Sequence, residues 1–338
     1  MTINQQIVLA SRPTGVASVD NFRLEASPLP AVPDGHVLVR HHFLSLDPYM
    51  RMRMNDTKSY AAPQAIGAVM LGGTVGEVVE SRSEKFAIGD KVAGSGGWQD
   101  YGLVDVRQPG TLRKLDVTAV PLSAYLGAVG MPGITAWYGL TQIIAPKAGE
   151  TIVVSAASGA VGTVLGQLAK ARGCRAVGLA GGPEKCAFVV DELGFDACVD
   201  YKAHADAASL RAALKFACPN GIDGNFENVG GAILNAVLGQ MNAFGRMAMC
   251  GMISGYDGAS VALEQPALIL TQRLKLQGFI VSEHLQFWPQ ARDELSAMVV
   301  SGKLKYRETI AQGIASAPQA FLGMLKGQNF GKQLVKLV

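Results

Sequence analysis

A short apolar segment followed by a turn that contains glycine constrains the fold of this chain more than any other feature. Thr151–Ser155 is a run rich in β-branched residues, as expected for a strand buried on both faces of a parallel sheet. Ala157, Gly159 and Gly162 follow in the spacing A-x-G-x-x-G. Beyond them, apolar side chains recur at helical spacing, at Val161, Leu165, Leu168 and Ala169. Strand, turn and helix therefore occur in the order found in dinucleotide-binding units.

Strands and helices continue to alternate as far as Cys250. Further strands are expected at Arg175–Ala180, Ala197–Asp200, Ile222–Glu227 and Gly245–Cys250. Helices are expected between them, at Glu184–Leu193, Ser209–Ala217 and Ala232–Met241. The alternation predicts an α/β, Rossmann-type, doubly wound parallel sheet.

The glycines of the first turn have separate expected roles. Gly159 would let the backbone approach a pyrophosphate, and Gly162 would let the following helix pack closely on the strand. The helix N-terminus would then offer N–H groups and the positive end of its dipole to the phosphates. A glycine triad alone is weak evidence, and here alanine takes its first position, so the prediction depends on the alternating series around it.

The end of the second expected strand bears on which nicotinamide cofactor would bind. NAD sites usually carry an acidic residue there, about 20 residues beyond the glycines, to bind the ribose 2′-hydroxyl. This chain has Ala180-Gly181-Gly182 instead, and Lys185 follows. A neutral strand end beside a cation favours the 2′-phosphate of NADP. Glu184 is the alternative, because a small change of backbone path would present its carboxylate to an NAD ribose.

Charge and cysteine content exclude several classes of function. The 30 basic and 27 acidic residues give a net charge of +3 without long blocks of one sign, so no nucleic-acid partner is expected. The cysteines all lie at or beyond Cys174 and form no C-x-x-C pair, and no H-E-x-x-H pattern occurs. No metal is therefore expected, and the thiols are expected to be reduced.

One uncharged stretch needs a choice between a membrane span and a buried helix. No residue between Asp116 and Lys147 is charged, but prolines and glycines interrupt the run. A helix buried in a soluble protein gives the same pattern, and no membrane contact is expected. The first six residues show no secretory signal, so a cytoplasmic location is expected.

Motifs outside the glycine turn resemble those of one enzyme family. They are LDPYMR at Leu46–Arg51, GSGGWQDY at Gly94–Tyr101, MPGITAWYGL at Met131–Leu140, ENVGG at Glu227–Gly231 and GMLKGQNFGK at Gly323–Lys332. Over nearly its full length the chain is similar to the zinc-independent branch of the medium-chain dehydrogenase/reductase superfamily. It resembles most the group of prostaglandin/leukotriene reductases, plant double-bond reductases and bacterial NADPH-dependent curcumin reductase.

The resemblance implies a domain organisation and an assembly. Residues 1–125 and 309–338 would form a GroES-like catalytic domain, a partly open β-barrel, with the Rossmann domain of residues 126–308 inserted between them. Members of the family are commonly homodimers. Zinc-dependent relatives hold zinc in the N-terminal domain with cysteine and histidine, whereas no cysteine precedes Cys174 here. The resemblance therefore implies zinc-independent chemistry that depends on the cofactor NADP(H).

The resemblance also implies cofactor contacts at individual positions. The phosphate turn would comprise Ser158, Gly159, Ala160, Val161 and Gly162. Lys185 and Tyr201 match positions that hold the adenosine 2′-phosphate. Contacts toward the nicotinamide half would come from Asn228, Cys250, Gly251, Ile253, Ser254, Tyr256, Phe279, Ile280, Val281 and Asn329. Core packing is the alternative for Phe279–Val281, and turn formation is the alternative for the two asparagines.

The activity implied by the resemblance is NADPH-dependent reduction of the C=C bond of an α,β-unsaturated ketone or aldehyde. Hydride added to the β-carbon leaves an enolate, whose oxygen needs a donor such as a tyrosine hydroxyl or the cofactor ribose. Tyr256 is the first candidate for this catalytic donor, and Tyr49 and Tyr60 are the others. Packing with the hydroxyl on water or backbone is the alternative for each tyrosine.

Met50 and Arg51 are further candidates for the substrate side, with the three tyrosines. Methionine and arginine alternate over Met50–Met54, which predicts a strand or loop with methionines lining an adaptable apolar pocket. Arg51 would attract an acidic substrate tail, or would only form an ion pair. Two alternative functions are an NADPH quinone oxidoreductase and a non-catalytic redox sensor that binds NADPH.

Overall fold

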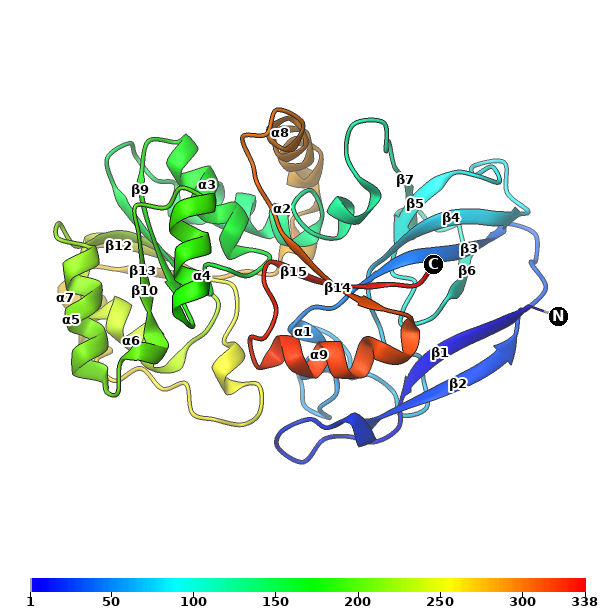
Figure 1. Ribbon diagram of the computed structural model, residues 1–338, viewed down its shortest axis with the longest axis horizontal. Helices are drawn as coiled ribbons and strands as arrows, with labels where there is room; N and C mark the ends of the chain where they lie inside the picture. The colour runs from blue at the N-terminus through cyan, green and yellow to red at the C-terminus, as the bar shows by residue number, and fades with distance from the viewer. Residues whose placement is uncertain (1) are drawn as a thin grey trace. The chain divides into compact units, whose positions relative to one another are not determined.

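The computed structural model describes residues 2–338, which divide into two compact units. Unit 1 comprises the residues up to Gly127 and from Glu308 onward, and unit 2 comprises Ala128–Arg307 (Figure 1). Unit 2 is thus inserted into the chain of unit 1, and each unit has its own sheet and its own core.

Unit 2 is built on a six-stranded parallel sheet. Its strands are β8 (Thr151–Ser155), β9 (Arg175–Ala180), β10 (Ala197–Asp200), β11 (Ile222–Glu227), β12 (Met241–Met249) and β13 (Lys275–Gly278). Their order across the sheet is β10-β9-β8-β11-β12-β13, so the direction of winding reverses between β8 and β11. This is the strand order of a Rossmann domain, and it confirms the predicted doubly wound sheet.

Helices α3 to α7 connect these strands, α2 precedes β8 and α8 follows β13, and Figure 1 shows α3, α5 and α6 beside the sheet. All five residues of β8 are buried, as the β-branched run predicts for a central strand. Helices α2 and α4 continue into single π-helical segments. The helices are α2 (Met131–Tyr138), α3 (Gly162–Ala171), α4 (Pro183–Ala187), α5 (Ala207–Ala217), α6 (Gly231–Leu238), α7 (Ala267–Thr271) and α8 (Trp288–Val300).

Two expectations for unit 2 differ from the structure. The helix expected over Ala232–Met241 ends at Leu238, and β12 begins at Met241 rather than at Gly245. Apolar residues continue through both elements, so periodicity alone did not separate them, while the Gly239-Gln240 turn does. The uncharged run after Asp116 is divided among short helices, and within residues 2–338 no helix combines the length and hydropathy needed to span a membrane.

Unit 1 combines the two ends of the chain in one mostly antiparallel sheet. Strand β15 pairs with β3 and, in parallel, with β14, while β6 forms a branch on β3. Strands β1 (Ile3–Leu9) and β2 (Phe22–Pro28) form a separate antiparallel pair. The seven-stranded sheet comprises β3 (His36–Ser45), β4 (Thr74–Ser81), β5 (Lys91–Gly94), β6 (Tyr101–Asp105), β7 (Leu112–Lys114), β14 (Glu308–Gln312) and β15 (Lys332–Lys336).

Two short helices, α1 (Tyr49–Arg53) and α9 (Ala317–Leu325), pack into the core of unit 1. Trp98 is fully buried there, stacked on Phe22 at 5.5 Å between ring centroids and meeting Phe321 of α9 edge-on at 5.5 Å. The alternating residues Met50–Met54 were expected on a strand or loop, and that expectation is wrong. Met50–Arg53 lie in α1 and Met54 caps it, and Met50 and Met54, four residues apart, are both buried in this core.

A buried ion pair holds the residues before α1 against the last strand. Lys332 of β15 places its Nζ 2.7 Å from Asp47 Oδ1 and 2.6 Å from the Leu46 carbonyl oxygen. Ser45 donates a further hydrogen bond to the Asp47 carboxylate. A buried lysine needs such partners, because an unpaired buried charge costs several kcal/mol. The pair therefore explains why residues from opposite ends of the chain meet here.

Candidate functional site

The turn between β8 and α3 has the geometry expected of a phosphate-binding turn. A Cβ added to Gly162 would lie 2.4 Å from the Ala156 carbonyl oxygen and 2.8 Å from the Ala157 Cα, so only glycine fits where α3 begins. A Cβ added to Gly159 would meet only the Ala156 oxygen, at 3.2 Å. Ser158, Gly159, Ala160 and Val161 therefore lead into a ten-residue helix whose N-terminus suits an anionic group.

The left-handed residue of this turn is Ala156, with φ of 50°, one position before the Ala157 that was aligned with the first glycine. A left-handed conformation costs an alanine about 1–2 kcal/mol. The turn is therefore strained at the strand end, where the backbone reverses into α3.

Cationic groups gather at the adjacent carboxyl ends of β9 and β10. A Cβ added to Gly181 would lie 2.7 Å from Tyr201 Oη and 2.9 Å from Lys202 Cε, so the missing side chain makes room for both. Burial, and then the charge of Lys202, lower the pKa of Lys185, which places the two ammonium groups near one another. Glu184, the competing carboxylate, is exposed on α4.

This group fits a phosphate better than a ribose hydroxyl. Two ammonium groups and a phenol can all donate to a dianion, whereas for a neutral hydroxyl only the phenol oxygen of the three could serve as an acceptor. The Asp200 carboxylate is turned to the backbone, since Oδ1 accepts from Gly182 N at 2.7 Å and from Lys202 N at 3.0 Å. Sequence reasoning missed Lys202. The feature that could have indicated Lys202 is its position directly after Tyr201, at the end of a strand next to β9.

A second group of polar residues lies where β8 and β11 are neighbours, at the switch point of the sheet. Asn228 donates from its backbone N–H to Ser155 Oγ at 2.7 Å and from Nδ2 to the Ser155 carbonyl oxygen at 2.8 Å. Glu227 is fully buried and accepts from the N–H groups of Val229 and Gly230, both at 2.7 Å. Burial raises the pKa of Glu227, and these N–H donors oppose the rise.

Neither Ser155 nor Glu227 was predicted. Both act on the backbone that carries Asn228, at the point where ligands bind to open α/β sheets. Sequence alone gives no signal for Ser155, because its role depends on β8 and β11 being adjacent although they are far apart along the chain.

The predicted nicotinamide-side loop rests on the same turn. The Cys250 and Gly251 N–H groups donate to the Glu227 carbonyl oxygen at 2.9 and 3.1 Å. Ser254 Oγ donates to the Val229 carbonyl oxygen at 2.6 Å, and Ile253 N donates to that of Asn228 at 3.2 Å. The structure therefore brings together Asn228, Cys250, Gly251, Ile253 and Ser254.

Tyr256 folds back over this loop. It follows the single turn of Ile253–Gly255, and its hydroxyl would lie 3.2 Å from a Cβ added to Gly251. Burial, and then the Glu227 carboxylate, raise the pKa of Cys250 to about 12, so that thiol stays protonated at neutral pH. The polar group that this loop offers for proton chemistry is therefore the tyrosine hydroxyl.

Phe279, Ile280 and Val281 follow the end of β13 rather than forming its core. Phe279 packs edge-on against Phe226 with ring centroids 6.1 Å apart and lies 5.4 Å from the ring of Tyr138. The Val281 carbonyl oxygen accepts from Trp288 Nε1 at 3.1 Å. Phe279–Val281 therefore presents backbone groups and apolar surface to a ligand, and no charged side chain.

The remaining predicted residues belong to unit 1. Burial, and then the Asp47 charge, raise the pKa of Tyr49. Tyr60 is close enough to affect Tyr49 electrostatically, and its own side chain is 55% exposed. Met50 is 1% exposed, in the core rather than along a pocket. Asn329 makes a local turn bond, from Nδ2 to the Gly331 carbonyl oxygen at 2.9 Å.

Arg51 is 2% exposed, and its guanidinium donates to Asn55 Oδ1 at 2.7 Å and to the Gly15 carbonyl oxygen at 2.5 Å. Both partners are internal to unit 1. The contacts favour a structural role for Arg51 over the predicted attraction of an acidic tail.

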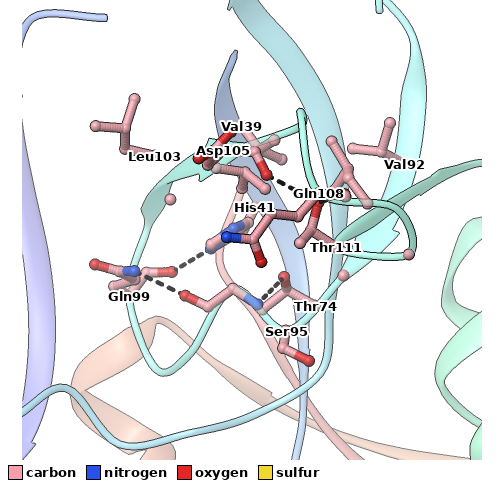
Figure 2. Close-up of a pocket in the computed structure, with 16 residues that line it drawn as sticks. Val39, His41, Thr74, Val92, Ser95, Gln99, Leu103, Asp105, Gln108 and Thr111 are labelled. Atoms are coloured by element: carbon pink, nitrogen blue, oxygen red, sulfur yellow. Dashed lines mark hydrogen bonds between the residues drawn. The ribbon is translucent and has the colours of Figure 1, made fainter. Parts of the chain in front are cut away.

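Unit 1 also contains a cavity of about 430 Å³ within its sheet (Figure 2). His41 is at its wall, with Nδ1 2.8 Å from the Gln99 carbonyl oxygen, and burial lowers the pKa of His41 to about 4. A Cβ added to Gly96 would lie 2.3 Å from His41 Nε2 and from Thr74 Oγ1. Among the described residues, those lining this cavity include none of the predicted site residues.

In residues 2–338, no three or more histidine, cysteine or acidic side chains are grouped so that they could hold a metal ion. Residues 5–112 match the family described as the N-terminal domain of oxidoreductase, and residues 160–297 match the family described as zinc-binding dehydrogenase. The second match covers the strands and turns that carry the cation group, together with Glu227 and Asn228 of the switch-point group.

Individual relatives match along nearly the whole chain. The NADPH-dependent curcumin reductase of Escherichia coli (strain K12) is 45% identical, with 99% of this chain and 97% of the relative covered. The NADP(+)-dependent 2-alkenal reductase of Nicotiana tabacum is 41% identical, with 98% and 97% covered. The crystal structure of CurA from Vibrio vulnificus in complex with NADPH is 44% identical, with a TM-score of 0.92 and 99% of both chains covered. The chain therefore belongs to the medium-chain dehydrogenase/reductase family, within the group of double-bond reductases that its sequence motifs predicted.

Proposed function

We propose that this protein is a zinc-independent, NADPH-dependent reductase of the C=C bond of α,β-unsaturated ketones and aldehydes. The observation that supports NADPH as the cofactor is the pair of lysines, Lys185 and Lys202, beside Tyr201 at the carboxyl ends of β9 and β10. Support for the substrate class comes from the relatives named as curcumin reductase and 2-alkenal reductase.

Each group of residues would hold one part of the cofactor. The two lysines and Tyr201 would hold the 2′-phosphate, and Ser158, Gly159, Ala160, Val161 and Gly162 would hold the pyrophosphate at the N-terminus of α3. Near the nicotinamide, the backbone of Phe279–Val281 and the loop from Cys250 to Tyr256 would supply neutral contacts. Asn228 and Asn329 would supply amide groups.

NADPH, when bound, supplies a hydride for the β-carbon of the substrate. Reduction at that carbon places negative charge on the carbonyl oxygen, and the chain's task is to stabilise this charge and to return a proton at the α-carbon. Tyr256 is the proposed donor, because its loop is fixed on the switch-point turn and a tyrosine hydroxyl is a suitable general acid. Tyr49 and Tyr60 are the alternative donors, from unit 1.

A homodimer and a cytoplasmic location are part of the proposal. Strand β13 is at the edge of the unit 2 sheet, and exposed sheet edges are available for pairing with a second chain. Large apolar side chains on the elements beside β13 are exposed, with Phe244 of β12 at 65% and Leu270 of α7 at 79%. The low content of charged residues, 17%, agrees with such a buried surface.

The experiment that tests the function is NADPH oxidation by the purified protein with a panel of enones, enals and quinones. The proposal predicts turnover of conjugated enones or enals, at a rate that chelators leave unchanged. Turnover of quinones alone would favour the quinone oxidoreductase, and tight NADPH binding without turnover would favour the sensor. Loss of activity on chelation would contradict the zinc-independent assignment.

The proposed donor is tested by Tyr256→Phe. Loss of a hydrogen bond to a developing oxyanion typically lowers kcat by about 10²–10³-fold, and we expect the KM for NADPH to change far less. Tyr49→Phe and Tyr60→Phe are the matched substitutions for the alternative donors. An unchanged kcat in Tyr256→Phe together with a loss in one of the others would move the role to unit 1.

A further inference from the structure

Two cysteines meet directly beneath the proposed 2′-phosphate site. Cys186 is on α4, and Cys198 is on β10, opposite Gly178 of β9. The absent side chain at Gly178 leaves room for the second thiol, since a Cβ there would lie 3.2 Å from Cys198 Sγ. The two thiols are close enough that each is the largest single influence on the pKa of the other, and the backbone of Ala180 acts on both.

These thiols differ from the cysteines that only fill the core. Cys174 and Cys218 are 3% and 1% exposed, whereas Cys186 and Cys198 are both half-buried. A half-buried thiol beside a second thiol can be reached by a small oxidant and has a partner with which to form a bond.

The two thiols are also electrostatically unequal. The hydrogen bond from its neighbour lowers the pKa of Cys186, against the opposing effect of burial, and the same contact followed by burial raises the pKa of Cys198. Cys186 is therefore the thiol that ionises first, and Cys198 is the thiol that remains protonated. A nucleophilic thiol next to a protonated resolving thiol is the arrangement of redox-sensitive cysteine pairs.

We propose that Cys186 and Cys198 form a site of reversible oxidation by peroxides, and that their disulfide weakens the binding of NADPH. The first part concerns the thiols alone. The second part rests on the proposed function, because it requires Lys185 and Lys202 to hold the 2′-phosphate.

The oxidation proceeds in two balanced steps. The Cys186 thiolate attacks one oxygen of the peroxide, so that an S–O bond forms, the O–O bond breaks, and the other oxygen leaves as an alcohol or water after taking a proton. Cys198 sulfur then attacks the Cys186 sulfur, forming the S–S bond and releasing the sulfenic oxygen as water with the Cys198 proton. Two thiols are oxidised by two electrons in total, and one peroxide is reduced.

The consequence for the cofactor follows from the neighbours of each cysteine. Lys185 directly precedes Cys186 on α4, and Asp200, which holds the backbone of Gly182 and Lys202, lies two residues beyond Cys198. A disulfide requires the sulfur atoms to approach to about 2.05 Å, which draws α4 toward β10. The backbone that carries the two lysines must then shift, and their placement around a phosphate is lost.

The site is tested by treating the full chain with hydrogen peroxide, removing the peroxide with catalase, and mapping peptides without reduction. Trypsin cleaves after Lys185 and Lys202, so Cys186 and Cys198 fall in one peptide, 186–202, with no other cysteine. We expect this peptide to lose the mass of two hydrogen atoms and to resist alkylation until dithiothreitol is added. Cys174 and Cys218 should remain alkylatable in the same sample.

Single variants assign the roles of the two thiols. Cys198→Ser should accumulate a sulfenic acid at Cys186 that dimedone traps, whereas Cys186→Ser should give no dimedone adduct at Cys198. A wild-type peptide that keeps two alkylatable thiols after peroxide treatment, or that goes directly to sulfinic acid, would overturn the proposal.

The effect on the cofactor is measured as the KM for NADPH before and after oxidation, with NADH as the matched control. We expect the KM for NADPH to rise about tenfold on oxidation and to return with dithiothreitol, with little change in the KM for NADH, because NADH lacks the phosphate. The Cys186→Ser/Cys198→Ser double variant should keep the reduced wild-type KM after peroxide treatment. An unchanged KM in a fully oxidised sample would refute the link to NADPH. Failure of the reduced protein to bind NADPH at all would instead refute the proposed function, while the peptide mass would still report the disulfide.

Discussion

At the scale of single residues, the assignment of NADPH as the cofactor depends on two lysine side chains. Lys185 and Lys202 come from different elements and lie within electrostatic reach of one another, and the absent side chain of Gly181 leaves room for Tyr201 and Lys202 at the end of β9. NADPH and NADH differ only in the phosphate that these residues would contact. The pair should therefore determine cofactor preference rather than turnover.

Replacing either lysine should reduce the preference for NADPH over NADH. For Lys185→Ala and for Lys202→Ala we expect the ratio of kcat/KM for NADPH to that for NADH to fall about tenfold, equivalent to about 1.4 kcal/mol. Lys215→Ala, on the exposed side of α5, is the matched control. Steady-state kinetics with both cofactors measures the ratio, and an unchanged ratio in both variants would contradict the assignment.

His41 should make the stability of the protein depend on pH. Its pKa is about 4 in the folded state against an ordinary value of 6.5, so the unfolded chain binds more protons between these values. Stability contributed by neutral His41 is therefore present above pH 6.5 and is lost as the pH falls toward 4, by about 3 kcal/mol over the whole range. Urea unfolding at several pH values measures this loss.

The matched variant for that measurement is His41→Gln, which cannot titrate in this range. Its free energy of unfolding should change less than that of the wild type between pH 7 and pH 4. Identical pH dependence in the two proteins would show that the pKa of His41 is the same in the folded and unfolded states, which would contradict the effect of its burial.

At the scale of elements, the connection between β8 and α3 depends more on Gly162 than on Gly159. Gly162→Ala should destabilise the protein by about 1–3 kcal/mol, because the added methyl meets backbone atoms of Ala156 and Ala157 that cannot rotate away. Gly159→Ala should cost less than about 1 kcal/mol, because the added methyl meets one atom at 3.2 Å. Chemical denaturation of the two variants compares them directly, and equal losses would contradict the packing described for α3.

The elements also show what the sequence could predict and what it could not. Strands β8, β9, β10 and β11 have the predicted bounds, because each is a short segment between turn residues in a series where strands and helices alternate. Helix α1 was mistaken for an extended segment, since four-residue spacing and alternation coincide in so short a stretch. Ser155 and Glu227 could not be found from the sequence, because their roles depend on which strands are neighbours in the sheet, whereas Lys202 was missed although it directly follows Tyr201.

At the scale of the whole molecule, β13 is one of the two edge strands of the parallel sheet of unit 2, the other being β10. If a second chain pairs there, light scattering of the purified protein should give twice the chain mass of 35.5 kDa, about 71 kDa. Phe244→Glu and Leu270→Glu change exposed side chains beside this edge and should shift the mass toward that of one chain. A wild-type mass of one chain would contradict the proposed homodimer.

The proposed reaction of the whole molecule is hydride transfer to the β-carbon of an enone. The most direct measurement is the position of deuterium in the product when the enzyme is supplied with NADPH that carries deuterium at the transferable position of the nicotinamide. We predict a saturated ketone or aldehyde with one deuterium on the former β-carbon, as nuclear magnetic resonance would show. Deuterium on the carbonyl carbon of an alcohol product, or a product without deuterium, would contradict the account.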